Sequence, residues 1–320
     1  MSPIKIRTLI ALCLNTIIDG IKFARHSSII SANNQEKLIA IITFNYHSLE
    51  KGFSMPEIRL GFGRKRVKYL MNQISIYVNK NYNTKHSQFI AACSVLKKYY
   101  LLHNEKRYDV SSYFTKEQFD LINLYANPNI GGAIEMQKEH YFDFQYANYE
   151  LFSKSRHSIR NFSERLVDHD KIKQAVELAK YCPSACNRQT SKVYLIEDSK
   201  KIQSILKIQQ GILATSETIR QLLIITANRN SFFSSGERNQ LYVDGGIFLQ
   251  SMLLSLHYYG IGACPLHWSL NSGQDKELQK IIHFSNAEKP IALIAIGNIE
   301  SKFRVPFSHR KNINEILVIV

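Results

Sequence analysis

The sequence predicts an α+β fold in which helices flank a central mixed sheet, preceded by a mostly helical N-terminal half. In the first half, apolar residues between Val67 and Tyr125 recur every three or four positions and do not alternate as in a strand. In the second half, short apolar runs that suit buried strands are separated by segments with helical spacing. One of these segments, from about Arg238 to Tyr259, is predicted to be the longest helix.

The length and composition indicate two domains with packed cores. The chain has 320 residues, of which 45% are apolar and 11% aromatic, and this composition excludes a disordered chain. A polar loop, Asn-Pro-Asn-Ile-Gly-Gly at 127–132, follows the helical half. We therefore place a boundary near Tyr149, within ten residues, and expect a helical domain over 1–149 and a second domain over 150–320.

The N-terminal segment 4–24 is predicted to be an amphipathic helix, because its Ile and Leu residues recur at helical spacing with charged residues elsewhere. Two cations precede an apolar run, but Asn15, Asp19 and Lys22 interrupt that run too early for a membrane span or a signal peptide. We expect the helix to bury its apolar face against its own domain, and attachment to a membrane surface is the alternative.

The positive charge is spread along the whole chain. The formal charge of +15, from 41 Lys/Arg and 26 Asp/Glu, divides almost evenly between the two halves. Such an excess suits anionic ligands, a membrane surface or nucleic acid alike. The run Arg64-Lys65-Arg66 lacks the aromatic interleaving of a nucleic-acid surface. We interpret it as the solvated start of a helix and expect no nucleic-acid partner.

In the second half, helices and strands are predicted after residue 156. Asp168 is the expected N-cap of a helix that continues to Lys180. A second helix is predicted over Ser199–Gln209, and the predicted strands are Val193–Ile196, Leu222–Ala227 and Ile291–Ile296.

The cysteines favour a reduced, cytoplasmic protein. There are five, an odd number in a long chain, whereas disulfide scaffolds are short and carry even numbers. Cys182, Cys186, Cys264 and His267 could supply four zinc ligands, but their spacing differs from that of structural zinc sites. We expect no metal and interpret these cysteines as small side chains near a pocket.

The densest group of chemically useful side chains is Arg-His-Ser-Ile-Arg-Asn-Phe at 156–162. Arg156 and Arg160 offer planar forks for phosphate oxygens, and Ser158 offers a short donor. Ile159 and Phe162 can attach the segment to a core. The cluster suits a phosphate, although basic pairs beside a serine are also common on solvated surfaces.

Three later stretches change the interpretation of this cluster. They are Pro-Ser-Ala-Cys-Asn-Arg-Gln at 183–189, Gly-Ile-Gly-Ala-Cys-Pro-Leu-His-Trp at 260–268, and Pro-Phe-Ser-His-Arg at 306–310. With the first cluster they resemble the FMN-dependent nitroreductase family, whose pattern is R-x-S-x-R/K, P-S-x-x-N-x-Q, G-x-x-x-x-P after a long helix, and a C-terminal Arg. The resemblance covers about 150–320. It implies a nitroreductase-like fold with a long central helix, in a homodimer with a shared flavin site.

The resemblance also implies roles for residues near the phosphate and the flavin edge. Arg156, His157 and Ser158 would hold the phosphate and ribityl end of FMN, and Arg310 would close the phosphate site. Arg160 would lie beside the N1–C2=O edge of the flavin and act as a catalytic residue. Ser308 stands where the family often has a second basic residue.

The remaining implied contacts concern the flavin ring. Five residues of one loop would lie along the ring from the partner subunit: Pro183, Ser184, Ala185, Asn187 and Gln189. Pro265, Leu266 and His267 would form a turn that covers the ring with a backbone N–H near N5, so His267 is the second predicted catalytic residue. Trp268 would line the substrate face. Family loops often continue with Pro-Trp after the glutamine, whereas this chain has Thr190 and Ser191.

The electron donor and acceptor also follow from the resemblance. No G-x-G-x-x-G motif supports a separate dinucleotide site. In the resembled enzymes, NAD(P)H and a small organic acceptor alternate over one exposed flavin face. A binding or scaffold protein without turnover and a peripheral membrane protein are the alternatives. Gly245 and Gly246 fit either tight packing within one subunit or proximity to a two-fold interface.

Overall fold

The computed structural model describes residues 3–26, 31–232 and 235–320. By their internal contacts these residues form two compact units. The sheet unit comprises 3–16 and 136–303, and the helical unit comprises 17–135 and 304–320. The helical unit thus takes in the last residues of the chain, which the sequence analysis assigns to the second domain.

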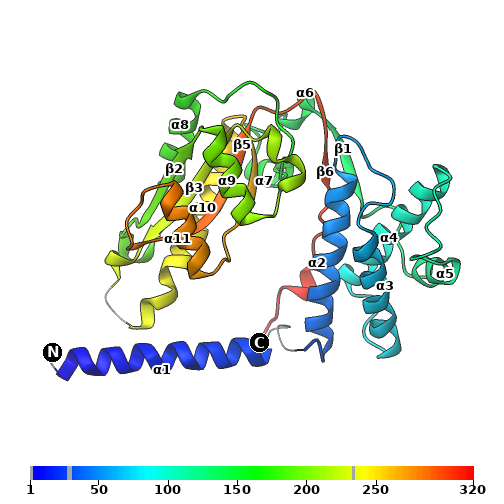
Figure 1. Cartoon of the computed structure of the whole chain (residues 1–320), viewed down its shortest axis with the longest axis horizontal. Helices are drawn as coiled ribbons and strands as arrows, with labels where there is room; N and C mark the ends of the chain where they lie inside the picture. The colour runs from blue at the N-terminus through cyan, green and yellow to red at the C-terminus, as the bar shows by residue number, and fades with distance from the viewer. Residues whose placement is uncertain (1–2, 27–30, 233–234) are drawn as a thin grey trace. The chain divides into compact units, whose positions relative to one another are not determined.

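The core of the helical unit lies among α2 (Gln35–Phe53), α3 (Arg64–Asn79), α4 (Ser87–Glu105) and α5 (Lys116–Asn123) (Figure 1). The Asn34 side chain caps α2 by accepting from the Lys37 N–H, and Thr115 and Gln118 form a capping box at α5. The prediction of a helical N-terminal region is confirmed. Arg64-Lys65-Arg66 is the exposed first turn of α3, as predicted.

Aromatic side chains fill much of the core of the helical unit. Tyr77, Phe89, Tyr99 and Phe114 are all fully buried. The rings of Tyr77 and Phe89 stack with centroids 4.7 Å apart, and the Tyr99 hydroxyl bonds to that of Tyr113 at 2.8 Å. Because each buried hydroxyl has a partner, these large rings are buried without an uncompensated polar group.

The C-terminal segment belongs to the helical unit through a contact at the start of α4. The Glu315 carboxylate accepts from the Ser87 backbone N–H at 2.9 Å and from the Ser87 hydroxyl at 2.6 Å. A carboxylate at a helix N-terminus is favourable because of the helix dipole. The segment reaches this point after strand β6 (Lys302–Pro306), which pairs with β1 (Ala133–Gln137). Neither strand is among those that the sequence analysis predicts.

The sheet unit is built on four strands in the order β2-β3-β5-β4: β2 (Ser191–Ile196), β3 (Gln221–Asn228), β5 (Glu288–Gly297) and β4 (Gly262–His267). The three strands predicted from apolar runs are β2, β3 and β5. All three pairings within this sheet are antiparallel, where a mixed sheet was predicted. The α+β class is confirmed.

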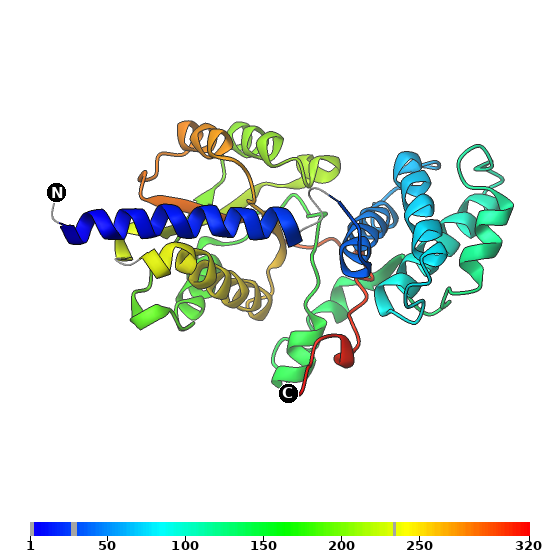
Figure 2. The ribbon, with the colours of Figure 1, turned by 90° about the horizontal axis from the view of Figure 1, so that it is seen from below.

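Helices cover both faces of this sheet (Figure 2). On one face, α8 (His169–Ala179) and α10 (Gln240–Tyr258) pack on Leu223 and Ile225 of β3. On the other face lie α9 (Ser199–Gln209) and α11 (Ser272–Ile281). Two short helices, α6 (Lys138–Tyr141) and α7 (Tyr149–Ser155), precede the first predicted site segment.

Helix α1 (Pro3–His26) confirms the predicted N-terminal helix but not its expected burial. Six of its Ile and Leu side chains are 45–62% exposed: Ile6, Leu9, Ile10, Leu14, Ile17 and Ile21. The expectation that this apolar face is buried against its own domain is therefore wrong for the single chain. None of the described helices combines the length and the apolarity that crossing a bilayer requires.

The two glycines of α10 have different surroundings. A Cβ on Gly245 would lie 2.7 Å from Cγ1 of Ile291, so Gly245 allows α10 to approach β5 closely. A Cβ on Gly246 would meet nothing within 4 Å, and Gly246 is exposed. Packing within one subunit therefore explains Gly245 and leaves Gly246 unexplained.

This contrast gives a matched pair of variants. We expect Gly245→Ala to lower the free energy of unfolding by about 1–3 kcal/mol, because the methyl group overpacks the contact with Ile291. Gly246→Ala is expected to raise it by up to about 1 kcal/mol, because alanine is the better helix former. Urea titration of both variants measures the difference. Loss of stability in Gly246→Ala would indicate that another surface packs closely on this position.

Candidate functional site

The segment 156–160 lies along the outer edge of β4. Its Ile159 side chain is buried, and the Ile159 N–H donates to the Ala263 carbonyl at 2.9 Å. Side chains alternate in an extended segment, so burial of Ile159 directs Ser158 and Arg160 to the opposite face. Both of these residues are half-buried. The structure therefore brings the R-x-S-x-R segment together with the strand that contains Pro265, Leu266 and His267.

Tyr141 holds this segment at its start. The Tyr141 hydroxyl accepts from the His157 N–H at 3.0 Å and donates to the His157 carbonyl at 3.2 Å. Burial raises the pKa of Tyr141, which therefore remains a donor at neutral pH. Tyr141 could not be identified from the sequence, because it lies in a Tyr-rich stretch with no distinguishing motif.

Arg160 is held by its own segment. Its Nη1 donates to the Ser158 carbonyl at 3.3 Å, which sets the direction of the guanidinium. Arg160 stands four residues before Glu164, the spacing at which an arginine and a glutamate on a helix form an ion pair. Residues 160–164 are not helical, and no Arg160–Glu164 ion pair is present in the part of the chain that the structure describes. The guanidinium is thus available to an anionic ligand.

The loop 183–189 is fixed to the N-terminal part of α10. The Ala185 N–H donates to the buried Asp244 carboxylate at 3.2 Å, and the Gln189 N–H donates to the Ser184 hydroxyl at 3.0 Å. The side chains of Asn187 and Gln189 are exposed and bond to each other at 3.1 Å. Asp244 was not predicted, since a single carboxylate within a helical pattern gives no signal of its partner.

This loop has an unusual backbone. Cys186, Asn187 and Gln189 have φ values of 50°, 54° and 50°, in the left-handed region that non-glycine residues rarely adopt. Arg188 holds the loop in place through Nη1 to the Ser231 carbonyl at 2.8 Å and an ion pair with Glu237. Strain of this kind persists where surrounding contacts impose it and is common at ligand sites.

A cavity of about 120 Å³ lies between this loop and α10, lined in part by Ser184, Gln189 and Asp244. Thr190 also lines it, and the buried Thr190 hydroxyl has no hydrogen-bond partner. A buried polar atom without a partner is costly, so this hydroxyl is suited to a ligand or a water molecule. Small-molecule sites usually measure 300 Å³ or more, so this cavity is only part of one.

Residues 265–267 form the end of β4, not the predicted turn. Pro265 is tolerated there because β4 is an edge strand. The carbonyls of Ala263 and His267 both face away from β5, since they accept from Ile159 and from Gln209 Nε2. The His267 N–H has the same outward direction by strand alternation. Trp268 is buried and its indole N–H donates to Asp275, so in this chain it does not line an open face.

The two halves of the predicted site are far apart within one chain. The loop contacts α10 at Asp244, whereas Ser155, next to Arg156, contacts α10 at His257. These two positions are 13 residues apart, or about 20 Å at the helical rise of 1.5 Å per residue. Arg310 belongs to the helical unit and Arg156 to the sheet unit.

The same separation bears on the zinc alternative. Cys182 and Cys186 precede β2, and Cys264 and His267 are on β4, at the opposite edge of the sheet. Three strand spacings amount to about 14 Å. Because zinc ligands must lie within about 2.3 Å of one ion, these four residues cannot share it. All five cysteines are free.

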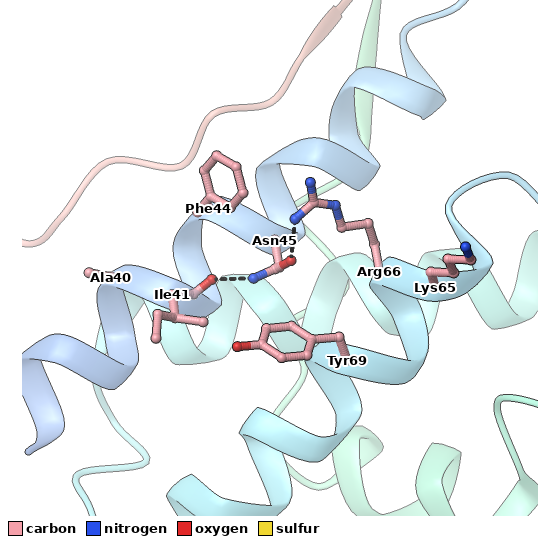
Figure 3. Close-up of a pocket in the computed structure, with 7 residues that line it drawn as sticks. All are labelled: Ala40, Ile41, Phe44, Asn45, Lys65, Arg66 and Tyr69. Carbon is pink, nitrogen blue, oxygen red and sulfur yellow. Dashed lines mark hydrogen bonds between the residues drawn. The ribbon is translucent and has the colours of Figure 1, made fainter. Parts of the chain in front are cut away.

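A larger open hollow of about 760 Å³ lies on the helical unit between α2 and α3. Phe44, Asn45, Arg66 and Tyr69 line it (Figure 3). Arg66 donates to the Asn45 side chain at 3.0 Å and lies over the Phe44 ring at 5.0 Å. None of the residues with predicted site roles lines this hollow.

His257 is the most perturbed histidine near the site. It is 2% exposed, its Nε2 bonds to the Ser155 hydroxyl at 2.8 Å, and the rings of Tyr141 and Phe152 pack against it. Burial, with the nearby side chains of Arg156 and His157, lowers the pKa of His257 to about 4. It is therefore neutral at physiological pH and supports the start of the 156–160 segment.

Comparison with known proteins finds one family. Residues 153–233 match the sequence model of the Nitroreductase family. No curated protein matches the chain.

Several solved structures are similar to the chain. A nitroreductase-like protein from Streptococcus mutans has a TM-score of 0.46 and 18% identity, covering 55% of this chain and 99% of that one. A nitroreductase family protein from Clostridium novyi NT has a TM-score of 0.41 and 22% identity, and the match covers 48% of this chain and 86% of that one. An FMN-dependent nitroreductase from Clostridium difficile R20291 has a TM-score of 0.41 and 19% identity, and the match covers 47% of this chain and 86% of that one.

The neutral His257 predicts a pH dependence of stability. Its pKa is lower in the folded chain than the ordinary value of about 6.5, so the unfolded chain binds more protons between pH 6.5 and 4. Its contribution is complete above pH 6.5 and is lost as the pH falls toward 4, by on the order of 3 kcal/mol. We expect His257→Gln to flatten this part of the stability profile, measured by urea unfolding.

The exposed His283 provides the control, since His283→Gln should leave the profile unchanged. Parallel loss of stability in the wild type and in His257→Gln over this pH range would contradict the role of His257.

Proposed function

We propose that the protein is an FMN-dependent oxidoreductase of the nitroreductase type that transfers hydride from NAD(P)H to a small organic acceptor. The match of 153–233 to that family supports the proposal. The observation that carries it is the Ile159–Ala263 hydrogen bond, which holds the R-x-S-x-R segment beside Pro265, Leu266 and His267. Cations, a hydroxyl and an outward backbone N–H are thereby adjacent, which is the donor set that a flavin mononucleotide needs.

The residues available fit FMN in two groups. Arg156, His157 and Ser158 would hold the phosphate and ribityl end, with Arg160 at the pyrimidine edge of the ring. Ser184, Asn187 and Gln189 would bond to the polar rim of the ring. The Thr190 hydroxyl, which is buried and lacks a partner, is an additional donor on the same loop.

The separation of these groups supports a homodimer with a shared site. Because about 20 Å of α10 lies between them in one chain, a single chain would leave each group as half a site. Tyr242, Val243 and Ile247 form an exposed apolar stripe near the start of α10, 37–52% exposed. Pairing these stripes about a two-fold axis would bury them and bring the loop of one copy toward the 156–160 segment of the other.

The chemistry follows from these positions. Bound FMN supplies a hydride acceptor and donor at N5. Arg160 would stabilise the negative charge that reduction leaves on the N1–C2=O side, and Arg156 would neutralise the phosphate. The outward His267 N–H would donate a hydrogen bond near N5. Donor and acceptor molecules would take turns at the exposed face, so no further acid or base is required of the protein.

Purified protein tests the proposal. We expect flavin absorbance at close to one FMN per chain, and bleaching of that absorbance by NADH or NADPH without oxygen, because the bound ring accepts hydride. A colourless protein that does not bind added FMN would contradict the flavin site. A yellow protein that neither nucleotide bleaches would instead support the binding or scaffold alternative.

Arg160 can be tested separately from phosphate binding. At ~4 Å and an effective dielectric near 20, a guanidinium contributes on the order of 4 kcal/mol to an anion, and about a third of that corresponds to ~30 mV for two electrons. We expect Arg160→Gln to lower the flavin midpoint potential by tens of millivolts while FMN stays bound, and Arg160→Lys to have a smaller effect. Potentiometric titration measures both.

Arg165 is exposed and only five residues away, so Arg165→Gln is the matched control and should leave the potential unchanged. An Arg160→Gln protein with full FMN content and the wild-type potential would exclude the electrostatic role.

A further inference from the structure

Helix α1 presents a continuous apolar face that the described chain leaves uncovered. It is a single unbroken helix of 24 residues (Figure 1). Its exposed apolar side chains are Ile6, Leu9, Ile10, Leu14, Ile17 and Ile21, each 45–62% exposed. Scattered exposed apolar residues are ordinary, but six on one helix form a patch of the kind that marks an interaction site.

The arrangement of these six residues defines the face. At 100° per residue they occupy an arc of about 140° around the helix axis. The opposite side carries Thr8 and Asn15, and Thr16, at the edge of the face, donates to the Leu12 carbonyl at 2.9 Å. A seam between two helices of a coiled coil needs only two apolar positions in seven, so this face is wider than such a seam. A broad flat partner suits it better.

The charge of the helix indicates the nature of that partner. The sequence of α1 contains four Lys/Arg residues and one Asp, a net charge of +3, and the whole chain carries +15. An apolar face of this width on a helix with net positive charge is the pattern of helices that lie in the interface of anionic membranes. One partner, an anionic membrane, would then cover the apolar side chains and neutralise the positive charge.

We propose that α1 attaches the protein to the surface of an anionic phospholipid bilayer. The helix lies in the plane of the interface with Ile10 and Ile17 inserted among the acyl chains and Arg7 among the headgroups. This attachment does not depend on the proposed oxidoreductase function. It would concentrate the protein at a membrane surface, where apolar molecules that partition into lipid are enriched.

Sedimentation with vesicles tests the attachment on the full chain. We expect the protein to sediment with phosphatidylcholine vesicles that contain phosphatidylglycerol, to remain in solution with pure phosphatidylcholine, and to be released as salt rises to 1 M. The double variant Ile10→Asn, Ile17→Asn should reduce the ratio of bound to free protein at least tenfold, because two apolar side chains no longer enter the bilayer.

Leu12→Asn is the matched control. Leu12 is also exposed, at 37%, but lies about 130° from the centre of the apolar face, and Leu→Asn lowers helix propensity at least as much as either Ile→Asn change. It should change binding less than twofold. Equal loss in Leu12→Asn and in the double variant would overturn the proposal, since it would show a general loss of helix α1.

Two further results would also overturn it. One is failure of the wild-type chain to sediment with anionic vesicles at low salt. The other is a smaller sedimentation coefficient of the double variant in lipid-free solution, which would show that a second copy of the chain covers this face.

Discussion

The hydrogen bond from the Ile159 N–H to the Ala263 carbonyl is the contact on which the candidate site depends. It covers the outer edge of β4, which would otherwise present unpaired backbone groups. Phe162 secures the same segment by packing on Gly297, where a Cβ would lie 2.8 Å from the Phe162 side chain. Because the segment is fixed at both of these points, Arg160 has a defined direction without an ion pair of its own.

Helix α10 determines the distance between the two groups of predicted site residues. The buried Asp244 fixes the strained loop near one end, and the neutral His257 supports the 156–160 segment near the other. Each group is held to α10 by a buried side chain of that helix. A ligand that needs both groups must therefore obtain one of them from another molecule.

The sequence was informative where a local pattern determines the structure. Helices with caps, such as the one that begins after Asp168, and the fully apolar strands β3 and β5 could be predicted because their signals lie within a few residues. Strand β4 was missed because Gly262 and Pro265 are poor strand residues that only an edge position tolerates. The antiparallel order depends on pairings far apart in the chain.

The site was predictable in part for the same reason. The R-x-S-x-R and P-S-x-x-N-x-Q motifs are contiguous, so their residues could be named from sequence. Tyr141, Asp244 and Thr190 could not, because each acts through a partner that only the fold brings near. Trp268 was assigned to an open face although it is buried against Asp275, since an exposed and a buried tryptophan look alike in a sequence.

The contact between Glu315 and Ser87 has a consequence for the order of folding. It joins residues 228 positions apart, and residues 136–303 of the sheet unit lie between them in the chain. A ribosome releases the first helices long before it makes Glu315, and during that interval the N-terminus of α4 lacks its carboxylate partner. The helical unit therefore begins to fold first but is completed last.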